Sequence, residues 1–249
     1  MSGEPRVVDL RGTLMTPLLS AIPVIAEQTG RPVVLVGGLA VICRLHSPYR
    51  ATSDLDTVDR RPAGEQSQLE LLVAAGATAS GPSGVLVPTR WGPVQVDVLQ
   101  VSEADVRDLP DDPTDRLHVL AHAWAATTAT ELVLSTPEVG RLTVAVAEPG
   151  ALIAMKLQSI MNRGAAKEGT DLLDIVRLSF DQGCGPISRM QLEQAEPQLR
   201  ADALLHARHW FQDNADRSLA KVRAVFEGRD TELDDLHLVG DLLVEALHG

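Results

Sequence analysis

The sequence predicts an α/β protein with a mixed β-sheet, followed by an all-helical C-terminal domain. Short β-branched runs alternate with helical patterns up to residue 148, and only helical patterns follow. The chain has 249 residues, which exceeds the about 150 residues of a typical single domain. We therefore expect two domains, an α/β core over residues 1–148 and a helical domain over residues 149–249.

The first predicted elements surround a pair of glycines. Apolar positions recur at helical spacing over residues 14–28, and a Gly-Arg-Pro turn ends this helix. The β-branched run 33–36 predicts a strand that leads directly into Gly37 and Gly38, and a helix is expected over residues 39–45. This order places a glycine turn between the end of a strand and the start of a helix.

The next strand is predicted over residues 52–58, where polar and apolar residues alternate. The stretch 103–115 carries six acidic residues and is expected to be a solvated loop. The other elements expected in this domain are a helix over 65–75, strands over 85–87 and 94–99, a helix over 118–130 and a strand over 142–146.

The second domain is predicted to contain helices only. Pro149 suits the first turn of a helix, and a strongly apolar helix is expected from Ala151 onward. Gly164 and Gly169 interrupt the helical pattern, so two helices are expected here instead of one. An acidic, Leu-rich helix is expected over residues 231–248.

Composition disfavours several classes of protein. The net charge of −12 repels phosphate backbones, and an aromatic content of 3% disfavours a base-stacking surface. Cys43 and Cys184 are too few for a disulfide framework, so we expect reduced thiols in a cytoplasmic protein. No signal-peptide pattern and no long apolar run occur, so no membrane partner is expected.

Three aspartates are the strongest candidates for chemistry. Asp54 and Asp56 are two positions apart on a predicted strand, so their carboxylates share one face, and Asp97 on a later strand can join them. Carboxylate oxygens are the ligands that Mg²⁺ (or Mn²⁺) prefers. Gly37 and Gly38 would let backbone N–H groups approach phosphates at a helix N-terminus.

Each of these signals has an ordinary structural alternative. An Asp-x-Asp motif alone fits a helix cap, a turn or a solvated strand end, and a Gly-Gly pair fits a tight turn in any α/β protein. The run Gly-Gly-Leu-Ala at residues 37–40 does not give the G-x-G-x-x-G pattern of a dinucleotide site, which disfavours that class. The order of the motifs is more specific than any one of them.

Two segments resemble a known family. GGLAVICRLHSPYRATSDLD resembles the signature of the AbiEii/AbiGii (MenT-like) nucleotidyltransferase toxin family, within the DNA polymerase β-like nucleotidyltransferase superfamily. AMKLQSIMNRGAAKEGTDLLDIVRL is similar to the second hallmark, a Lys, an Arg and a Lys-Asp-x-x-Asp-Leu run. The chain departs at Glu168, where that run has Asp, and at Gly38, where relatives often have Ser. The matching positions are Gly37, Gly38, Arg50, Thr52, Asp54, Asp56, Lys156, Arg163, Lys167, Asp171 and Leu172.

The resemblance implies a polymerase β-like nucleotidyltransferase core and metal-dependent transfer of a nucleotidyl group from a nucleoside triphosphate to an acceptor hydroxyl. We expect Asp54, Asp56 and Asp97 to hold Mg²⁺ (or Mn²⁺), with Asp97 also serving as the base. Catalytic roles are also implied for Lys156 and Asp171. The implied nucleotide-binding residues are Gly37, Gly38, Arg50, Thr52, Lys156, Arg163 and Lys167.

Helix geometry bears on the three cations in this set. At about 100° per residue, Lys156, Arg163 and Lys167 would lie on one side of a continuous helix, where they could hold phosphate. The alternative is a solvated basic face with Lys–Glu pairing.

The resemblance also implies a biological role. It suggests a toxin of a toxin–antitoxin or abortive-infection pair, with a tRNA 3′ end as acceptor and a cognate antitoxin as partner. One alternative is a nucleotidyltransferase whose acceptor is a small molecule or a protein, because other enzymes with the same core use such acceptors. Another alternative is a non-catalytic binding module of this fold.

Overall fold

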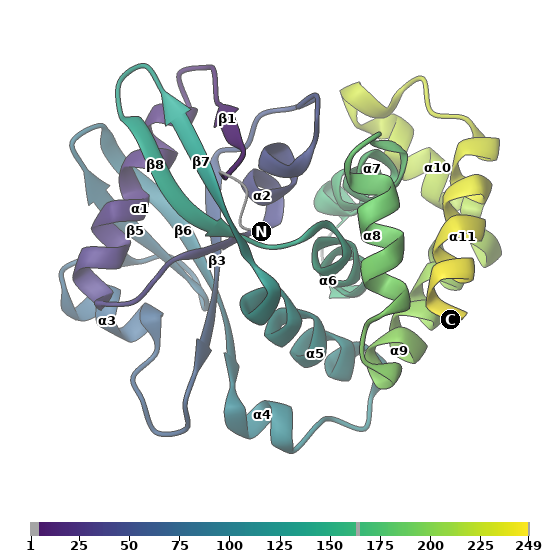
Figure 1. The fold of residues 1–249 in the computed structure, drawn as a ribbon, viewed down its shortest axis with the longest axis horizontal. Helices are drawn as coiled ribbons and strands as arrows, with labels where there is room; N and C mark the ends of the chain where they lie inside the picture. The colour runs from purple at the N-terminus through teal and green to yellow at the C-terminus, as the bar shows by residue number, and fades with distance from the viewer. Residues whose placement is uncertain (1–4, 163–164, 249) are drawn as a thin grey trace. The chain divides into compact units, whose positions relative to one another are not determined.

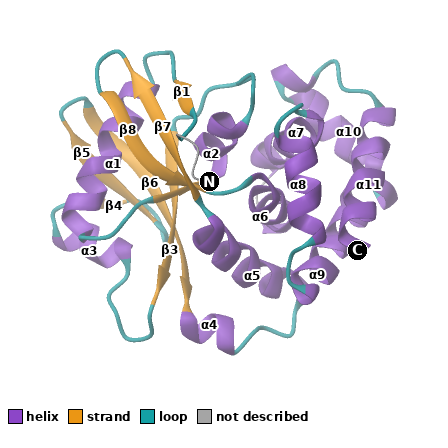
Figure 2. Ribbon diagram, in the orientation of Figure 1, coloured by secondary structure: helices purple, strands orange, loops and turns teal. Residues whose placement is uncertain are grey.

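The computed structural model describes residues 5–162 and 165–248, and these residues form one eight-stranded mixed sheet and eleven α-helices (Figures 1 and 2). The predicted α/β class with a mixed sheet is therefore confirmed. The chain divides into two compact units. The first contains the residues up to Cys43, Ala51–Arg107 and Ala125–Ala147, and the second contains Arg44–Arg50, Asp108–Trp124 and the residues from Glu148 onward.

The sheet lies entirely in the first unit. Its strand order is β1-β7-β8-β2-β3-β6-β5-β4. The pairs β1/β7, β2/β8 and β3/β6 are parallel and the others are antiparallel. The strands are β1 (Val7–Asp9), β2 (Val34–Val36), β3 (Asp54–Arg61), β4 (Thr78–Ala79), β5 (Gly84–Thr89), β6 (Gly92–Ser102), β7 (Thr130–Thr136) and β8 (Gly140–Val146).

Helices α1 (Met15–Thr29) and α3 (Gln68–Ala74) pack together on one face of this sheet (Figure 1). On β3 the hydroxyl of Thr57 donates to Gln68 Oε1 at 2.8 Å, so the odd-numbered side chains of β3 face α3. Because successive side chains of a strand alternate, Asp54 and Asp56 lie on the opposite face.

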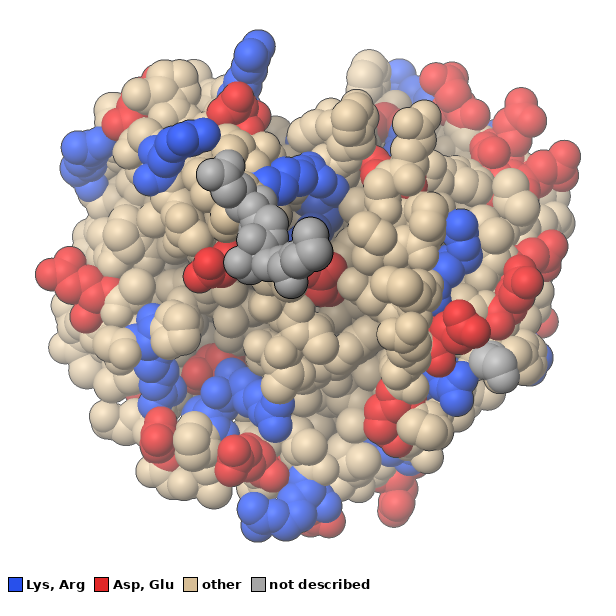
Figure 3. All heavy atoms as spheres, viewed as in Figure 1, with Lys and Arg blue, Asp and Glu red and all other residues tan. Residues whose placement is uncertain are grey.

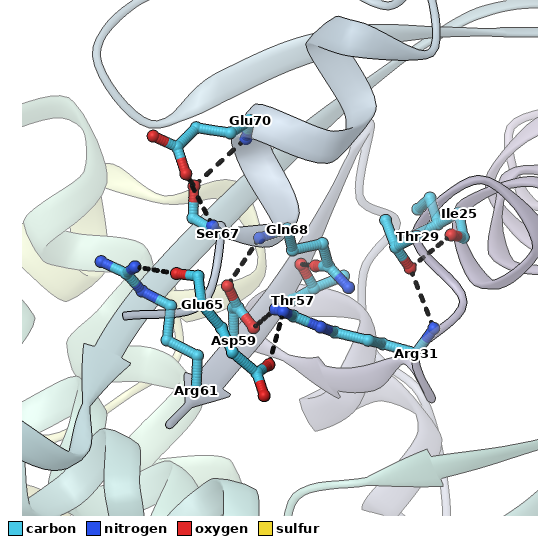
Figure 4. A network of polar contacts seen from close by, with 10 residues as sticks. All are labelled: Ile25, Thr29, Arg31, Thr57, Asp59, Arg61, Glu65, Ser67, Gln68 and Glu70. Carbon is cyan, nitrogen blue, oxygen red and sulfur yellow. Dashed lines mark hydrogen bonds and ion pairs between the residues drawn. The ribbon is translucent and has the colours of Figure 1, made fainter. Parts of the chain in front are cut away.

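A network of polar contacts joins β3 to α3 (Figure 4). Buried Asp59 accepts the backbone N–H of Gln68 at 2.7 Å and a guanidinium N–H of Arg31 at 3.3 Å. Ser67 and Glu70 form a capping box that starts α3. The network fixes the far end of the strand that carries Asp54 and Asp56.

The second unit contains helices and loops but no strand in its described part. Its interior is filled by fully buried apolar side chains such as Ile153, Leu157, Leu172 and Phe211. The remaining helices of the chain are α2 (Gly37–Arg44), α4 (Glu103–Arg107), α5 (Pro113–Thr128), α6 (Pro149–Asn162), α7 (Ala165–Phe180), α8 (Cys184–Glu193), α9 (Pro197–Arg208), α10 (Ala215–Ala224) and α11 (Leu233–His248), with a π turn at His209–Asp213 and a 3₁₀ turn at Phe226–Gly228.

Four elements differ from expectation. The acid-rich stretch was expected to be a loop, but α4 begins in it, because Ser102 and Asp105 cap each other through hydrogen bonds of 2.7–3.2 Å. Strands β1 and β4 are three and two residues long, too short for a periodic pattern. The strand β7 begins where a helix was still expected, because it pairs with β8 along its whole length.

Two further expectations concern the cysteines and the membrane. Cys43 and Cys184 are both buried thiols that form no disulfide, as expected. In the part of the chain that the structure describes, no helix combines the length and the apolar character that crossing a membrane requires.

Candidate active site

Three aspartates gather on one face of the sheet, and we call Asp54, Asp56 and Asp97 the acid cluster. One carboxylate oxygen of each lies within 4.8 Å of the others. The cluster forms because β3 and β6 are parallel neighbours in a register that places Asp56 directly beside Asp97 and Asp54 beside Gln95. The strands thus bring together the three acids that the sequence singled out.

The acid cluster has the chemistry of a divalent-cation site. In octahedral Mg²⁺ coordination the ligand oxygens lie about 3–4 Å apart, so small side-chain rotations bring these three oxygens to that spacing. Asp56 is 7% exposed and its two neighbours are half-buried, so three close negative charges repel one another with little screening by water. A divalent cation would offset that repulsion, and the residues present therefore fit Mg²⁺ or Mn²⁺.

The glycine pair lies against Asp56. Gly37 has a φ of +63°, a left-handed conformation that favours glycine. A Cβ at this position would overlap the Asp56 carboxylate. The next amide, Gly38 N–H, donates to Asp56 Oδ2 at 3.4 Å. Helix α2 thus begins directly on this carboxylate, and its dipole favours the negative charge there.

The other two carboxylates each accept a hydrogen bond from a residue two positions earlier on the chain. The Thr52 hydroxyl donates to Asp54 Oδ1 at 2.7 Å, and the Gln95 amide donates to Asp97 Oδ1 at 2.8 Å. Thr52 was expected in the nucleotide-binding set, whereas Gln95 was not singled out. The signal for Gln95 was its i, i+2 spacing from Asp97 on one strand, which places both on the same face.

A second group of charged residues lies within the helical unit. We call Tyr49, Arg50, Lys156, Asp171 and Asp174 the buried ion cluster. Lys156 on α6 contacts Asp171 and, at 2.8 Å, Asp174 Oδ2, both on α7. Arg50 donates to both oxygens of Asp174, at 3.1 and 2.8 Å, and the Tyr49 hydroxyl also donates to Asp174. These contacts join α6 and α7 to the segment before β3.

Burial and charge set the protonation states in the buried ion cluster. Burial alone would raise the pKa of Asp174, but the charge of Lys156 and the hydrogen bonds of Arg50 outweigh it and lower that pKa. Burial alone would lower the pKa of Lys156, but the charges of Asp174 and Asp171 raise it above its ordinary value. Burial, followed by the Asp174 charge, raises the pKa of Tyr49. Asp174, Lys156 and Arg50 therefore stay ionised together at neutral pH, while Tyr49 stays protonated.

The expected row of three cations is only partly described. Lys156 is buried and Lys167 is exposed, while Arg163 lies outside the described residues. Lys156 on α6 contacts Asp171 on α7, so the region forms two helices, as expected. Gly169 does not interrupt the helical pattern, because it lies inside α7, and Gly164 lies outside the described residues. Asp174, which no motif singled out, lies three positions after Asp171 on α7, a spacing that places both on one side of the helix.

On the face of the molecule drawn in Figure 3, the surface charge is mixed. In Figure 3, basic and acidic side chains are interspersed on the strand-containing part and on the helical part alike. This mixture accords with 22 basic and 34 acidic residues in the whole sequence.

Comparison with known proteins gives distant similarities. No family model matches the chain, and no curated protein matches its sequence, so the likeness to the AbiEii family stays a resemblance. The chain is similar to the solved structure of an antigenic nucleotidyltransferase-like protein from Paracoccidioides brasiliensis, with 18% identity, a TM-score of 0.45 and coverage of 87% of this chain and 98% of that one. It is also similar to a candidate nucleotidyltransferase from H. pylori, with 16% identity, a TM-score of 0.44 and coverage of 96% and 98%. Because both similarities are distant, we infer function from the geometry of the site.

Proposed function

We propose that this protein is a metal-dependent nucleotidyltransferase that moves a nucleoside monophosphate from a nucleoside triphosphate to an acceptor hydroxyl. The observation that carries the proposal is the acid cluster, in which one oxygen of each of three carboxylates lies within 4.8 Å of the others beside a glycine turn. That donor set suits divalent ions, and such ions are the usual means of neutralising a triphosphate in this chemistry.

The acids have distinct proposed roles. Asp54 and Asp56 hold the ions, and Asp97 completes the ligand set and accepts the proton of the attacking hydroxyl. The acceptor oxygen forms a bond to the α-phosphorus, the bond from that phosphorus to the bridging oxygen breaks, and pyrophosphate leaves. When bound, the divalent ions supply charge neutralisation and activation of the hydroxyl.

We propose Gly37, Gly38, Arg50, Thr52, Lys156, Arg163 and Lys167 as the nucleotide-binding residues, with Asp171 assisting Lys156. Arg50 and Lys156 are ion-paired with Asp174, so a triphosphate must compete with that carboxylate for them. Such competition would couple nucleotide binding to the buried ion cluster.

For the acceptor we propose RNA, with a tRNA 3′ end first, and a toxin role opposed by an antitoxin. The sequence resemblance supports this choice, and Arg60 and Arg61 add positive charge to the strand that carries the acids, at its opposite end from Asp54. The net charge of −12 opposes it. A protein or small-molecule acceptor is the outcome to be distinguished by experiment.

The test is label transfer. The purified protein is incubated with Mg²⁺, total tRNA and each of four α-³²P-labelled ribonucleoside triphosphates in turn. The matched variants are Asp54→Ala/Asp56→Ala and, as a control that removes the same charge from exposed positions, Asp108→Ala/Asp115→Ala. We expect labelled tRNA from the wild type and the control only.

Other results separate the alternatives. Triphosphate consumption without labelled RNA would point to a protein or small-molecule acceptor. No consumption of any triphosphate would contradict the enzymatic function and favour a binding module.

A further inference from the structure

We propose that Gln95 is a positioning residue that fixes the orientation of Asp97 for metal binding. This inference rests on the proposed function, because it assigns Gln95 a role at the same site. The Gln95 side-chain amide donates to Asp97 Oδ1 at 2.8 Å, and both residues lie on the cluster-bearing face of β6. Among the described residues, Asp97 makes no other hydrogen bond through its carboxylate.

The consequence for Asp97 is a restricted side-chain rotation. A half-buried carboxylate on a strand can rotate about two side-chain bonds, and each rotation moves its oxygens relative to Asp54 and Asp56. One hydrogen bond from a neighbour on the same strand holds Oδ1 in place and therefore sets the direction of Oδ2. Hydrogen-bond partners of metal-binding side chains act in this way, because they orient the ligand before the ion arrives.

The neighbouring strand leaves room for this contact. Gly84 on β5 is the cross-strand partner of Asp97. A Cβ at Gly84 would overlap the Gln95 amide nitrogen and the Ser80 carbonyl oxygen, and would lie 2.7 Å from Asp97 Oδ1. A glycine at this position therefore permits the Gln95–Asp97 hydrogen bond, which any larger residue would disturb.

The adjacent strand repeats the arrangement. Thr52 donates to Asp54 Oδ1 just as Gln95 donates to Asp97 Oδ1, in each case from two positions earlier. Asp56, between them, lies against the Gly38 amide. Each acid of the cluster thus has one oxygen that accepts a hydrogen bond from a neutral donor.

The test measures metal binding directly. The full-length protein is freed of metal with a chelator, the chelator is removed, and Mn²⁺ is titrated while the signal of unbound Mn²⁺ is followed by electron paramagnetic resonance. Gln95→Met keeps the length of the side chain but removes the donor. The matched control is Gln100→Met, since Gln100 is a half-buried glutamine of the same strand on the opposite face.

We expect Gln95→Met to weaken Mn²⁺ binding by about tenfold or more, and Gln100→Met to bind as the wild type does. In the transfer assay, the Mg²⁺ concentration for half-maximal rate should rise by a similar factor, with a smaller loss of rate at saturating Mg²⁺. A merely structural role would lower thermal stability without this shift. Should Gln95→Met not fold, Gln95→Asn replaces it, because the shorter amide cannot reach Asp97.

Two failures are distinguishable. If Asp54→Ala/Asp56→Ala binds Mn²⁺ much more weakly than the wild type but Gln95→Met binds equally well, the role of Gln95 is overturned and the proposed function stands. If the wild type and the Asp54→Ala/Asp56→Ala variant bind Mn²⁺ equally well, the acid cluster is not the metal site. That result would overturn both the role of Gln95 and the proposed function.

Discussion

Asp56 is the most buried acid of the acid cluster and lies beside two other carboxylates. Asp56→Asn removes a proposed metal ligand and one of three repelling charges, so we expect turnover to fall by at least about 100-fold while the protein unfolds at an unchanged or higher temperature. The first effect is measured by label transfer and the second by thermal unfolding in a chelator. An active Asp56→Asn protein would contradict the assignment.

Gly37 offers a second prediction at the scale of one residue. Gly30 and Gly37 have nearly equal φ values of +64° and +63°, but a Cβ at Gly30 meets nothing within 4 Å, whereas one at Gly37 overlaps Asp56. Gly30→Ala should cost about 1–2 kcal/mol of backbone strain. Gly37→Ala should cost more than that and also abolish transfer.

Urea unfolding of Gly30→Ala and Gly37→Ala measures the cost of the overlap with Asp56. Both variants carry nearly the same backbone strain, which cancels in the difference between their free energies of unfolding. Equal losses of stability in the two variants would show that the Asp56 carboxylate moves away from the new methyl group at no cost. That result would contradict the expected overlap at Gly37.

At the scale of elements, Asp174 joins α6, α7 and the segment before β3. Asp174→Ala leaves Arg50 and Lys156 without their shared carboxylate, so we expect a loss of about 3–5 kcal/mol in the free energy of unfolding at pH 7. The pKa of Asp174 is lowered in the folded protein. Its stabilisation is therefore present above its ordinary pKa of about 3.9 and is lost as the pH falls through the lower folded-state value.

Urea unfolding between pH 2 and pH 7 checks this expectation. The difference in stability between the wild type and Asp174→Ala should be constant above about pH 5 and shrink under more acidic conditions. A difference that stays constant to pH 2 would contradict it.

The same scale shows how far the sequence could predict the fold and the site. Strands β3 and β6 have long patterns and α2 follows a glycine turn, so the sequence predicted these three elements. The parallel register of β3 and β6 then brings Asp54, Asp56 and Asp97 together. Gln95 could have been found from the same alternation, because it lies two positions before Asp97 on β6. Asp174 could not, because its importance comes from partners that other segments supply. Strands as short as β4 carry no period at all.

At the scale of the whole molecule, the net charge of −12 must be overcome locally if RNA is the acceptor. Binding through about three phosphate contacts would make the logarithm of RNA affinity fall with the logarithm of salt concentration at a slope of about −2. The KM for tRNA should therefore rise steeply between low and physiological salt. The measurement is initial rate against tRNA concentration at several salt levels, and a flat response would favour a small-molecule or protein acceptor.

The pairing of β3 with β6 has a consequence for how this chain can change length. The segment between these strands, which includes α3, β4 and β5, can gain or lose residues in its loops without altering which side chains of β3 and β6 lie side by side. A single residue inserted into β6 ahead of Gln95 would instead turn Asp97 to the other face of the sheet. Sequences that descend from this one should therefore differ in length mainly in the loops between β3 and β6, whereas the number of residues in β6 should stay the same.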